Sequence, residues 1–116
     1  MPDYMLLLRG TYHVERRLSP EEMQAMMGRF TQWIRELGAR GQFRGGDPFR
    51  QEGRMVAFGG GPVVSDGPFL ETKDAVGGYL ILAAETLDAA MALAAGCPLV
   101  QAGAGVEVRP IQLMAP

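Results

Sequence analysis

The chain has 116 residues, of which 47% are hydrophobic and 21% charged. This usage is typical of one folded globular domain and excludes a disordered chain. A formal charge of −2 offers no basic surface for phosphates, so we expect neither nucleic acid nor an anionic membrane as a partner. The apolar runs are far shorter than the roughly 20 residues that cross a bilayer, and no signal-peptide core is recognisable. We expect a single cytoplasmic domain over residues 1–116.

The first two predicted elements are a buried strand and a long amphipathic helix. The apolar run at residues 4–8 predicts a strand that is buried on both faces. Ser19 and Glu22 have the spacing of a capping box, and Pro20 stands at the first helical position. Apolar residues then recur every three or four positions up to Gly38, so we predict a helix of about five turns. The apolar stripe consists of Met23, Met26, Met27, Phe30, Ile34 and Leu37.

The middle of the chain predicts short strands joined by tight turns. The strand candidates are residues 42–44, 55–58 and 62–64. The segment 45–48 (Gly-Gly-Asp-Pro) and the three glycines at 59–61 separate them as turns. The three glycines resemble a phosphate-binding loop only superficially, because they lie between strands and no Gly-Lys-Ser/Thr follows. A β-rich region with hairpin turns is therefore expected.

A second strand and helix follow, and the chain ends on a strand. Residues 78–84 form another apolar run, and Thr86 is placed to cap a helix that extends to residue 95. Apolar and polar residues alternate strictly at 106–109, and the alternation resumes out of phase at 111–113. This pattern predicts a last strand with a bend or bulge after its first part.

The predicted order resembles two strand–helix–strand units around one antiparallel sheet. This is the ferredoxin-like α+β plan, with two helices on one face of the sheet. The strands at residues 4–8 and 78–84 are nevertheless apolar at both alternating sets of positions. The face opposite the helices then has apolar side chains without cover. We expect a homodimer in which the two sheets pack against each other.

Residues 66–74 are the first candidate site for chemistry. Asp66 and the glycine and proline after it favour a rigid Asx-type turn, which is a purely structural interpretation. That interpretation leaves Glu71, Lys73 and Asp74 unexplained, although they place three ionisable groups close together. Such groups can shift each other's pKa values and act as an acid, a base or an anion clamp.

Lys73 is the single lysine beside ten arginines. Heavy use of arginine is consistent with genome composition, which accounts for the missing lysines but not for the one that remains. Lysine is a compact point charge that can lose its proton when it is desolvated, and arginine cannot replace that property. The alternatives are a functional Lys73 and a surface ion pair that contributes little to stability.

The chain also has one histidine and one cysteine, which are the remaining side chains that we consider as candidates for chemistry. His13 follows the first predicted strand, where it is either an acid–base residue or an ordinary loop residue. Cys97 has no Cys or His nearby, so a zinc site within one chain is excluded and a small buried apolar role is expected. A metal site with oxygen ligands from Asp66, Glu71 and Asp74 stays an open alternative, although no sequence pattern supports it. We expect no metal and no cofactor.

Four separated segments of the sequence form a recognisable set. They are residues 66–73 (DGPFLETK), 77–81 (GGYLI), 96–98 (GCP) and 106–111 (VEVRPI). Together these segments resemble the YCII-related family, in its DGPF type. The opening strand and the start of the first helix also fit the family, so the resemblance covers nearly the whole chain.

The resemblance implies a bacterial protein that forms a dimeric α+β barrel from ferredoxin-like subunits. Most members have no known activity, but one branch is thought to use a His–Asp pair, for which His13 and Asp66 are the only candidates here. Association of DGPF-type domains with extracytoplasmic-function sigma factors implies a possible regulatory partner.

Three functions stay open at this point: an enzyme without a metal, a sensor of a small ligand, and a dimerisation module. The first two need a pocket near residues 66–73 for a small organic ligand, and an anion is one candidate for it. The catalytic candidates are Asp66, His13, Lys73 and Glu71, and the ligand-binding candidates are Phe69, Tyr79 and Arg44, with Lys73 and Arg44 as anion clamps.

Overall fold

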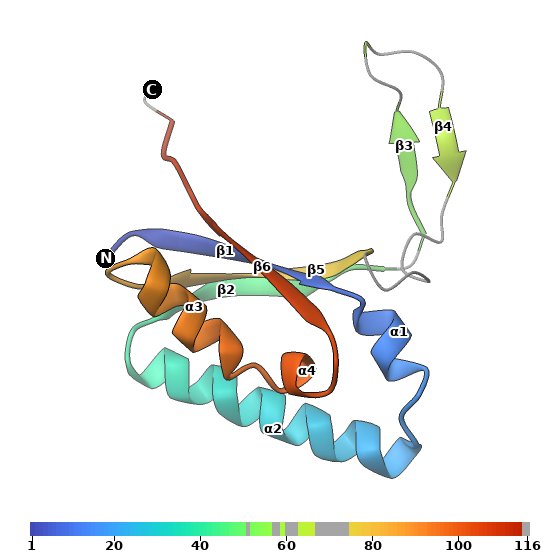
Figure 1. The fold of residues 1–116 in the computed structure, drawn as a ribbon, viewed down its shortest axis with the longest axis horizontal. Coiled ribbons are helices and arrows are strands. Elements are labelled where there is room, and N and C mark those ends of the chain that lie inside the picture. The colour runs from blue at the N-terminus through green and yellow to red at the C-terminus, as the bar shows by residue number, and fades with distance from the viewer. Residues whose placement is uncertain (51, 57–58, 60–62, 67–74, 115–116) are drawn as a thin grey trace.

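Four strands form one antiparallel sheet in a computed structural model, which describes residues 1–50, 52–56, 59, 63–66 and 75–114. The strand order is β2-β5-β1-β6, and Figure 1 shows α2 and α3 on one face of this sheet. A separate two-stranded sheet, β3-β4, projects away from it. The elements are β1 Asp3–Arg9, α1 Thr11–Glu15, α2 Pro20–Ala39, β2 Phe43–Pro48, β3 Arg54–Val56, β4 Val63–Asp66, β5 Val76–Ala83, α3 Leu87–Ala95, α4 Pro98–Gln101 and β6 Gly105–Pro110.

The sheet topology confirms the predicted ferredoxin-like plan. Central strand β1 pairs with β5 on one side and with β6 on the other, so that Leu6 lies opposite both Leu80 and Val108. Strand β2 pairs with the far edge of β5. Each helical connection therefore spans one intervening strand, which gives an all-antiparallel sheet from two strand–helix–strand units.

The core lies between this sheet and the helices. Alternate residues of β1 are buried, namely Tyr4, Leu6 and Leu8, because successive side chains of a strand point to opposite faces. The intervening Met5 and Leu7 are half-buried on the other face. The largest fully buried side chains are Leu6, Met26, Leu37, Leu82 and Cys97.

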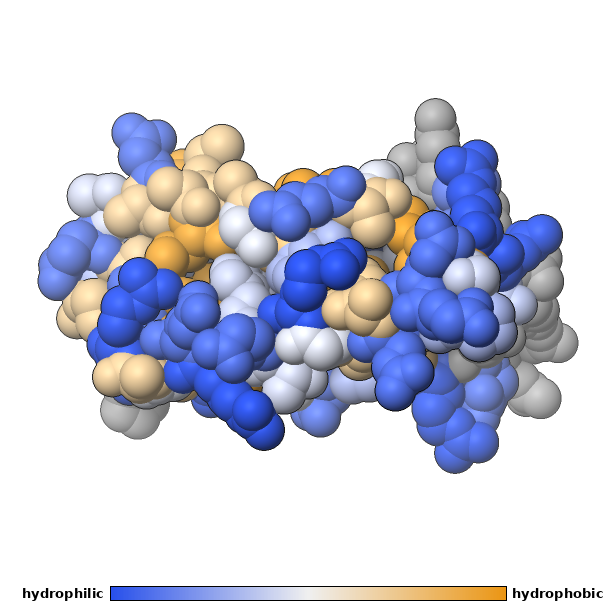
Figure 2. All heavy atoms as spheres, turned by 90° about the horizontal axis from the view of Figure 1, so that it is seen from below, coloured by the Kyte–Doolittle hydropathy of each residue, from blue (hydrophilic) through white to orange (hydrophobic). Residues whose placement is uncertain are grey.

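Helix α2 begins as its capping box predicts. The Glu22 backbone N–H donates to Ser19 Oγ at 3.1 Å, and the Ser19 N–H donates to Glu22 Oε1 at 2.9 Å. Met26 and Leu37 are buried on the side that faces the sheet. Phe30 and Trp33 are half-buried, and their ring centroids are 5.7 Å apart. Figure 2 shows that hydrophilic side chains cover much of the outer, helical face.

The turn predicted at residues 45–48 is wrong, because strand β2 continues through it. A register shift between Phe43 and Gly45 admits the two glycines into the strand. Gly46 has φ 154°, and a Cβ at this position would lie 2.8 Å from Leu80 Cα. Glycine is therefore required where β2 and β5 approach closely.

Three further boundaries differ from the sequence-based prediction. Helix α1 replaces the expected loop after β1, and Pro98 starts the short helix α4 just after the predicted helix stop. Residues 111–113 do not extend the last strand. The predicted strands 55–58 and 62–64 correspond to β3 and β4, and residues 57–58 and 60–62 lie outside the described part of the chain.

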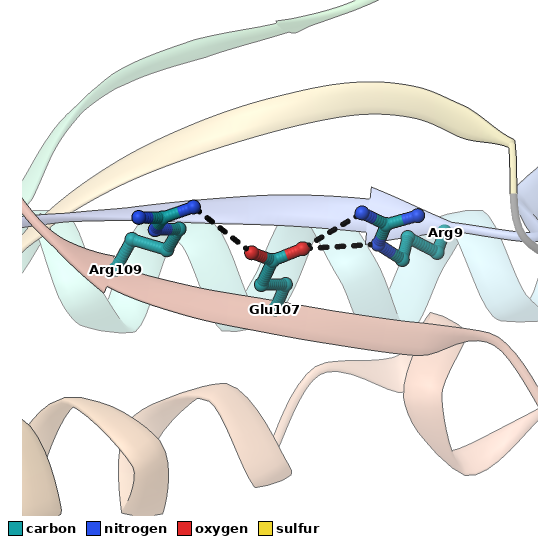
Figure 3. A network of polar contacts seen from close by, with 3 residues as sticks. All are labelled: Arg9, Glu107 and Arg109. Atoms are coloured by element: carbon teal, nitrogen blue, oxygen red, sulfur yellow. Dashed lines mark hydrogen bonds and ion pairs between the residues drawn. The ribbon is translucent and has the colours of Figure 1, made fainter.

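The sheet face opposite the helices combines apolar and charged residues. Glu107 lies between Arg9 and Arg109, with shortest N–O distances of 2.8 and 3.5 Å (Figure 3). Arg44 Nε lies 3.5 Å from Asp3 Oδ1 on the same face.

Within the described residues, no helix is long and apolar enough to span a membrane.

Candidate functional site

A cavity of about 490 Å³ opens between α1, α2 and the paired strands β2 and β5. Its volume falls within the range of small-molecule sites, roughly 300 to 1,000 Å³. Aliphatic and aromatic side chains form most of its wall. The apolar residues that line it include Leu8, Met27, Phe30, Ile34, Phe43, Phe49, Leu80 and Leu99.

Helix α1 supplies a polar edge to this cavity. Thr11, Tyr12 and Glu15 all line it, because residues three or four positions apart lie on the same side of a helix. Val14 is buried on another side and packs in the hydrophobic core. Gly10 precedes the helix with φ 74°, a left-handed conformation that redirects the chain at the end of β1.

A glycine in β5 lets α1 approach the sheet. Gly77 is buried, and a Cβ added to it would overlap Thr11 Oγ1 and lie 3.3 Å from Thr11 Cβ. The Gly10 N–H also donates to the Ala75 carbonyl at 2.9 Å. These two contacts position the polar edge of the cavity relative to β5.

Glu15 is half-buried in the cavity wall. Its partial removal from water raises the pKa of its carboxyl group above the ordinary value. Among the residues that the structure describes, none makes a hydrogen bond or ion pair with this carboxyl group. A carboxyl group in such surroundings can donate or accept a proton within the cavity.

The remaining polar wall comes from α2 and from the end of β2. Thr31 and Arg35 are exposed residues of α2 that line the cavity. The Tyr79 hydroxyl donates to Asp47 Oδ2 at 3.4 Å, and the Tyr79 ring lies 6.0 Å from that of Phe49. Tyr79 is paired in register with both Leu7 and Asp47, so its side chain and this hydrogen bond lie toward the sheet face opposite the helices.

The structure places three of the predicted site residues in different positions. Tyr79 lies in the cavity wall. His13 is half-buried in α1 but is not among the residues that line the cavity, because Tyr12 and Glu15 occupy that side of the helix. Arg44 is exposed, does not line the cavity, and pairs with Asp3.

The other four predicted site residues belong to the DGPF segment or its start. Asp66 is the last residue of β4, and its side chain lies outside the described part of the structure. Phe69, Glu71 and Lys73 lie outside the described residues altogether. Their assignments, and the proposed pairing of Asp66 with His13, stay predictions.

Sequence reasoning missed the polar edge formed by Thr11, Tyr12 and Glu15. It treated residues 11–15 as a loop, because the segment is short and lacks a capping residue. The available signal was the three-residue spacing of Tyr12 and Glu15 immediately after Gly10, which matches one helical turn. Recognising it as a cavity wall would also have required knowing that Gly77 lies opposite.

The fold and the site define a ferredoxin-like α+β domain with a cavity between its sheet and helices. The family model of the YCII-related domain matches residues 4–115, so the chain belongs to the YCII-related family. No curated protein matches the chain.

One solved structure is similar in fold over nearly the whole chain. It is 5-chloro-2-hydroxyhydroquinone dehydrochlorinase (TftG) from Burkholderia phenoliruptrix AC1100 in complex with 2,5-dihydroxybenzoquinone. The two chains are 16% identical with a TM-score of 0.51, and the match covers 95% of this chain and 93% of the other. At this identity the likeness shows a shared fold.

Proposed function

We propose that this protein binds a small aromatic molecule that carries hydroxyl groups in the cavity between α1, α2, β2 and β5. The observation that carries the proposal is the composition of the cavity wall, which is mostly apolar with one polar edge on α1. Ligand sites commonly combine such walls with a few polar groups that orient the ligand. The cavity volume of about 490 Å³ is sufficient for a substituted six-membered ring.

The aromatic character of the wall favours a flat ligand. Phe30, Phe43 and Phe49 line the cavity. Aromatic side chains contribute large apolar contact areas and prefer offset or edge-to-face contact with another ring. The similar fold of the dehydrochlorinase, whose complex contains 2,5-dihydroxybenzoquinone, adds support for a ring ligand with hydroxyl groups.

The polar edge makes acid–base chemistry on such a ligand possible within the same proposal. Glu15 has a raised pKa and lines the cavity, so it is able to exchange a proton with a ligand hydroxyl group. The Tyr12 hydroxyl group, one helical turn away, provides a second polar contact. Binding alone, as in a ligand sensor with a sigma-factor partner, remains the alternative use of the cavity.

The functional unit that we propose is a homodimer built on the open sheet face. Met5, Leu7 and Ile81 are apolar, half-buried residues there, while hydrophilic side chains cover much of the helical face (Figure 2). The face also contains both signs of charge, in Arg9 and Glu107, so two copies can pair opposite charges across a two-fold axis.

Isothermal titration calorimetry with hydroquinone and catechol, which are both neutral at pH 7, tests the binding proposal. We expect saturable binding by the wild-type protein and its loss in Thr31→Trp, because a large side chain at the cavity wall occupies ligand space. Gln32→Trp is the matched control, since Gln32 is the adjacent exposed residue of α2 and does not line the cavity. The proposal fails if neither ring compound binds the wild type, or if both variants bind alike.

A further inference from the structure

Among the residues that the structure describes, three charged side chains line the cavity, and their surroundings differ. Arg35 and Asp47 are exposed to solvent, whereas Glu15 is half-buried. Asp47 also accepts the hydrogen bond of the Tyr79 hydroxyl group. Of these three charged groups, Glu15 is therefore the least exposed to water. Its carboxyl group also accepts no hydrogen bond from the described residues.

The neighbours of Glu15 leave it ready to accept a donor from a ligand. Thr11 and Tyr12 precede it by one helical turn on α1, and Phe30 and Ile34 of α2 contribute apolar side chains to the same cavity. Withdrawal from water raises the pKa of Glu15, which indicates that its ionised form lacks compensating contacts. A ligand that donates a hydrogen bond supplies the missing contact, and a charged acceptor makes that bond stronger than a neutral one does.

On this basis we propose that Glu15 is a specificity-determining residue of the cavity, where its carboxyl group accepts a hydrogen bond from a ring hydroxyl group. The inference rests on the proposed function and narrows its ligand class to neutral aromatic alcohols. Aromatic carboxylates are disfavoured, because they bring a second negative charge next to Glu15. Arg35 does not reverse this preference, since its exposed guanidinium group is screened by water.

A comparison of two ligands in two proteins isolates the proposed hydrogen bond. Hydroquinone has two donor hydroxyl groups, and 1,4-dimethoxybenzene has the same ring without a donor. We expect Glu15→Leu to weaken hydroquinone binding by about tenfold or more, the size of a hydrogen bond to a charged group. Binding of 1,4-dimethoxybenzene should change by less than about threefold, because no hydrogen bond to it is lost.

Two further variants separate the role of the carboxyl group from general effects of charge and shape. Glu15→Gln keeps the shape and a neutral acceptor, so an intermediate loss of hydroquinone affinity is expected. Glu85→Gln removes the same charge from an exposed residue outside the cavity and should leave both ligands unaffected. Thermal unfolding followed by circular dichroism verifies that each variant is folded before titration.

Four other outcomes of these titrations would contradict either the role of Glu15 or the proposed function. Equal weakening of both ligands in Glu15→Leu would overturn the inference, because Glu15 would then act on cavity shape. Unchanged hydroquinone binding would overturn it as well. If benzoate binds the wild type more tightly than hydroquinone and loses affinity in Arg35→Gln, the cavity is an anion site and the inference is wrong. If the wild type binds no ring compound, the proposed function itself fails, a result visible before any Glu15 variant is made.

Discussion

At the scale of single residues, Glu107 illustrates how sheet register determines the ionisation of a side chain. Arg9 donates to Glu107 Oε1 through Nε at 3.1 Å and through a terminal nitrogen at 2.8 Å, and Arg109 lies farther away at 3.5 Å. The hydrogen bonds from Arg9, followed by the attraction of both arginines, hold the pKa of Glu107 below its ordinary value. The two arginines are therefore unequal partners of one carboxylate.

We predict that Arg9→Gln raises the pKa of Glu107 toward its ordinary value, measured by NMR titration of the side-chain carboxyl carbon. Arg109→Gln is the matched control and should raise this pKa less, since its hydrogen bond is longer. Because the folded pKa lies below the unfolded one, the stabilisation by this pair is present above the unfolded pKa and lost as the pH falls through the folded pKa. An Arg109→Gln effect as large as that of Arg9→Gln would contradict this ranking.

Residues with local roles were predictable, and residues whose roles depend on distant partners were not. Ser19 and Glu22 satisfy each other within one helical turn, so their spacing was enough to predict the start of α2. Glu15 belongs to the cavity only because α1 packs beside β5, far along the chain. The sequence around Glu15 indicated at most one helical turn, so it could not show that Glu15 lines a cavity.

At the scale of elements, the position of α1 depends on the absence of a side chain at Gly77. This glycine is in β5 and its Cα faces Thr11, the first residue of α1. A short helix has little stability of its own, so its placement comes from tertiary contacts. The position of the polar edge of the cavity therefore depends on the residue at position 77 of the sheet.

We predict that Gly77→Ala destabilises the fold by about 1 to 3 kcal/mol, because the added methyl group forces α1 away from β5. Ligand affinity should fall as well, since α1 carries Tyr12 and Glu15. Urea denaturation measures the first effect and calorimetry the second. Gly105→Ala is the control, because its Cβ would meet its nearest neighbour, Arg9 Cβ, at an ordinary distance of 3.9 Å.

The double variant Thr11→Ala/Gly77→Ala tests the cause of this destabilisation. Removing the Thr11 hydroxyl group eliminates the overlapping atom, so part of the lost stability should return. If the double variant is less stable than Gly77→Ala by the full cost of Thr11→Ala, then the two positions act independently and steric overlap is not the cause.

Elements that depend on local sequence patterns could be predicted, and elements that depend on distant pairing partners could not. Helix α2 has a strong periodic pattern, and strands β1 and β5 have continuous apolar runs, so the existence and type of these elements were predicted correctly. Strand β2 was predicted too short, because Gly45 and Gly46 favour a turn locally. In the structure, pairing with β5 keeps them extended. Pairing partners are distant in sequence, so local propensity could not indicate this outcome.

At the scale of the whole molecule, the open sheet face is where assembly is expected. Its strands β1 and β5 present Met5, Leu7 and Ile81 to the side opposite the helices. Sheet faces with such residues are normally packed against another layer. The described residues contain no element that covers this face, and the second copy of the chain that we propose would do so.

We predict that Leu7→Arg converts the proposed homodimer into a monomer, because it places an added charge at an apolar position of the proposed interface. Multi-angle light scattering at micromolar concentration measures the mass of both forms. Met91→Arg makes the same kind of change at an exposed position of α3, away from this face, and should leave the dimer intact. A wild-type mass of one chain would refute the dimer.

The pairing of β2 with β5 has a consequence for the extent of the cavity. The two strands are hydrogen-bonded neighbours, and just beyond β2 the Phe49 N–H donates to the Gly77 carbonyl at 2.8 Å. This bond closes the stem of the segment between residues 50 and 75, and both ends of the stem lie at the cavity. The register of β2 against β5 is therefore determined up to the point where the chain leaves the sheet, and the same backbone bond that closes the stem also determines where the cavity ends on this side.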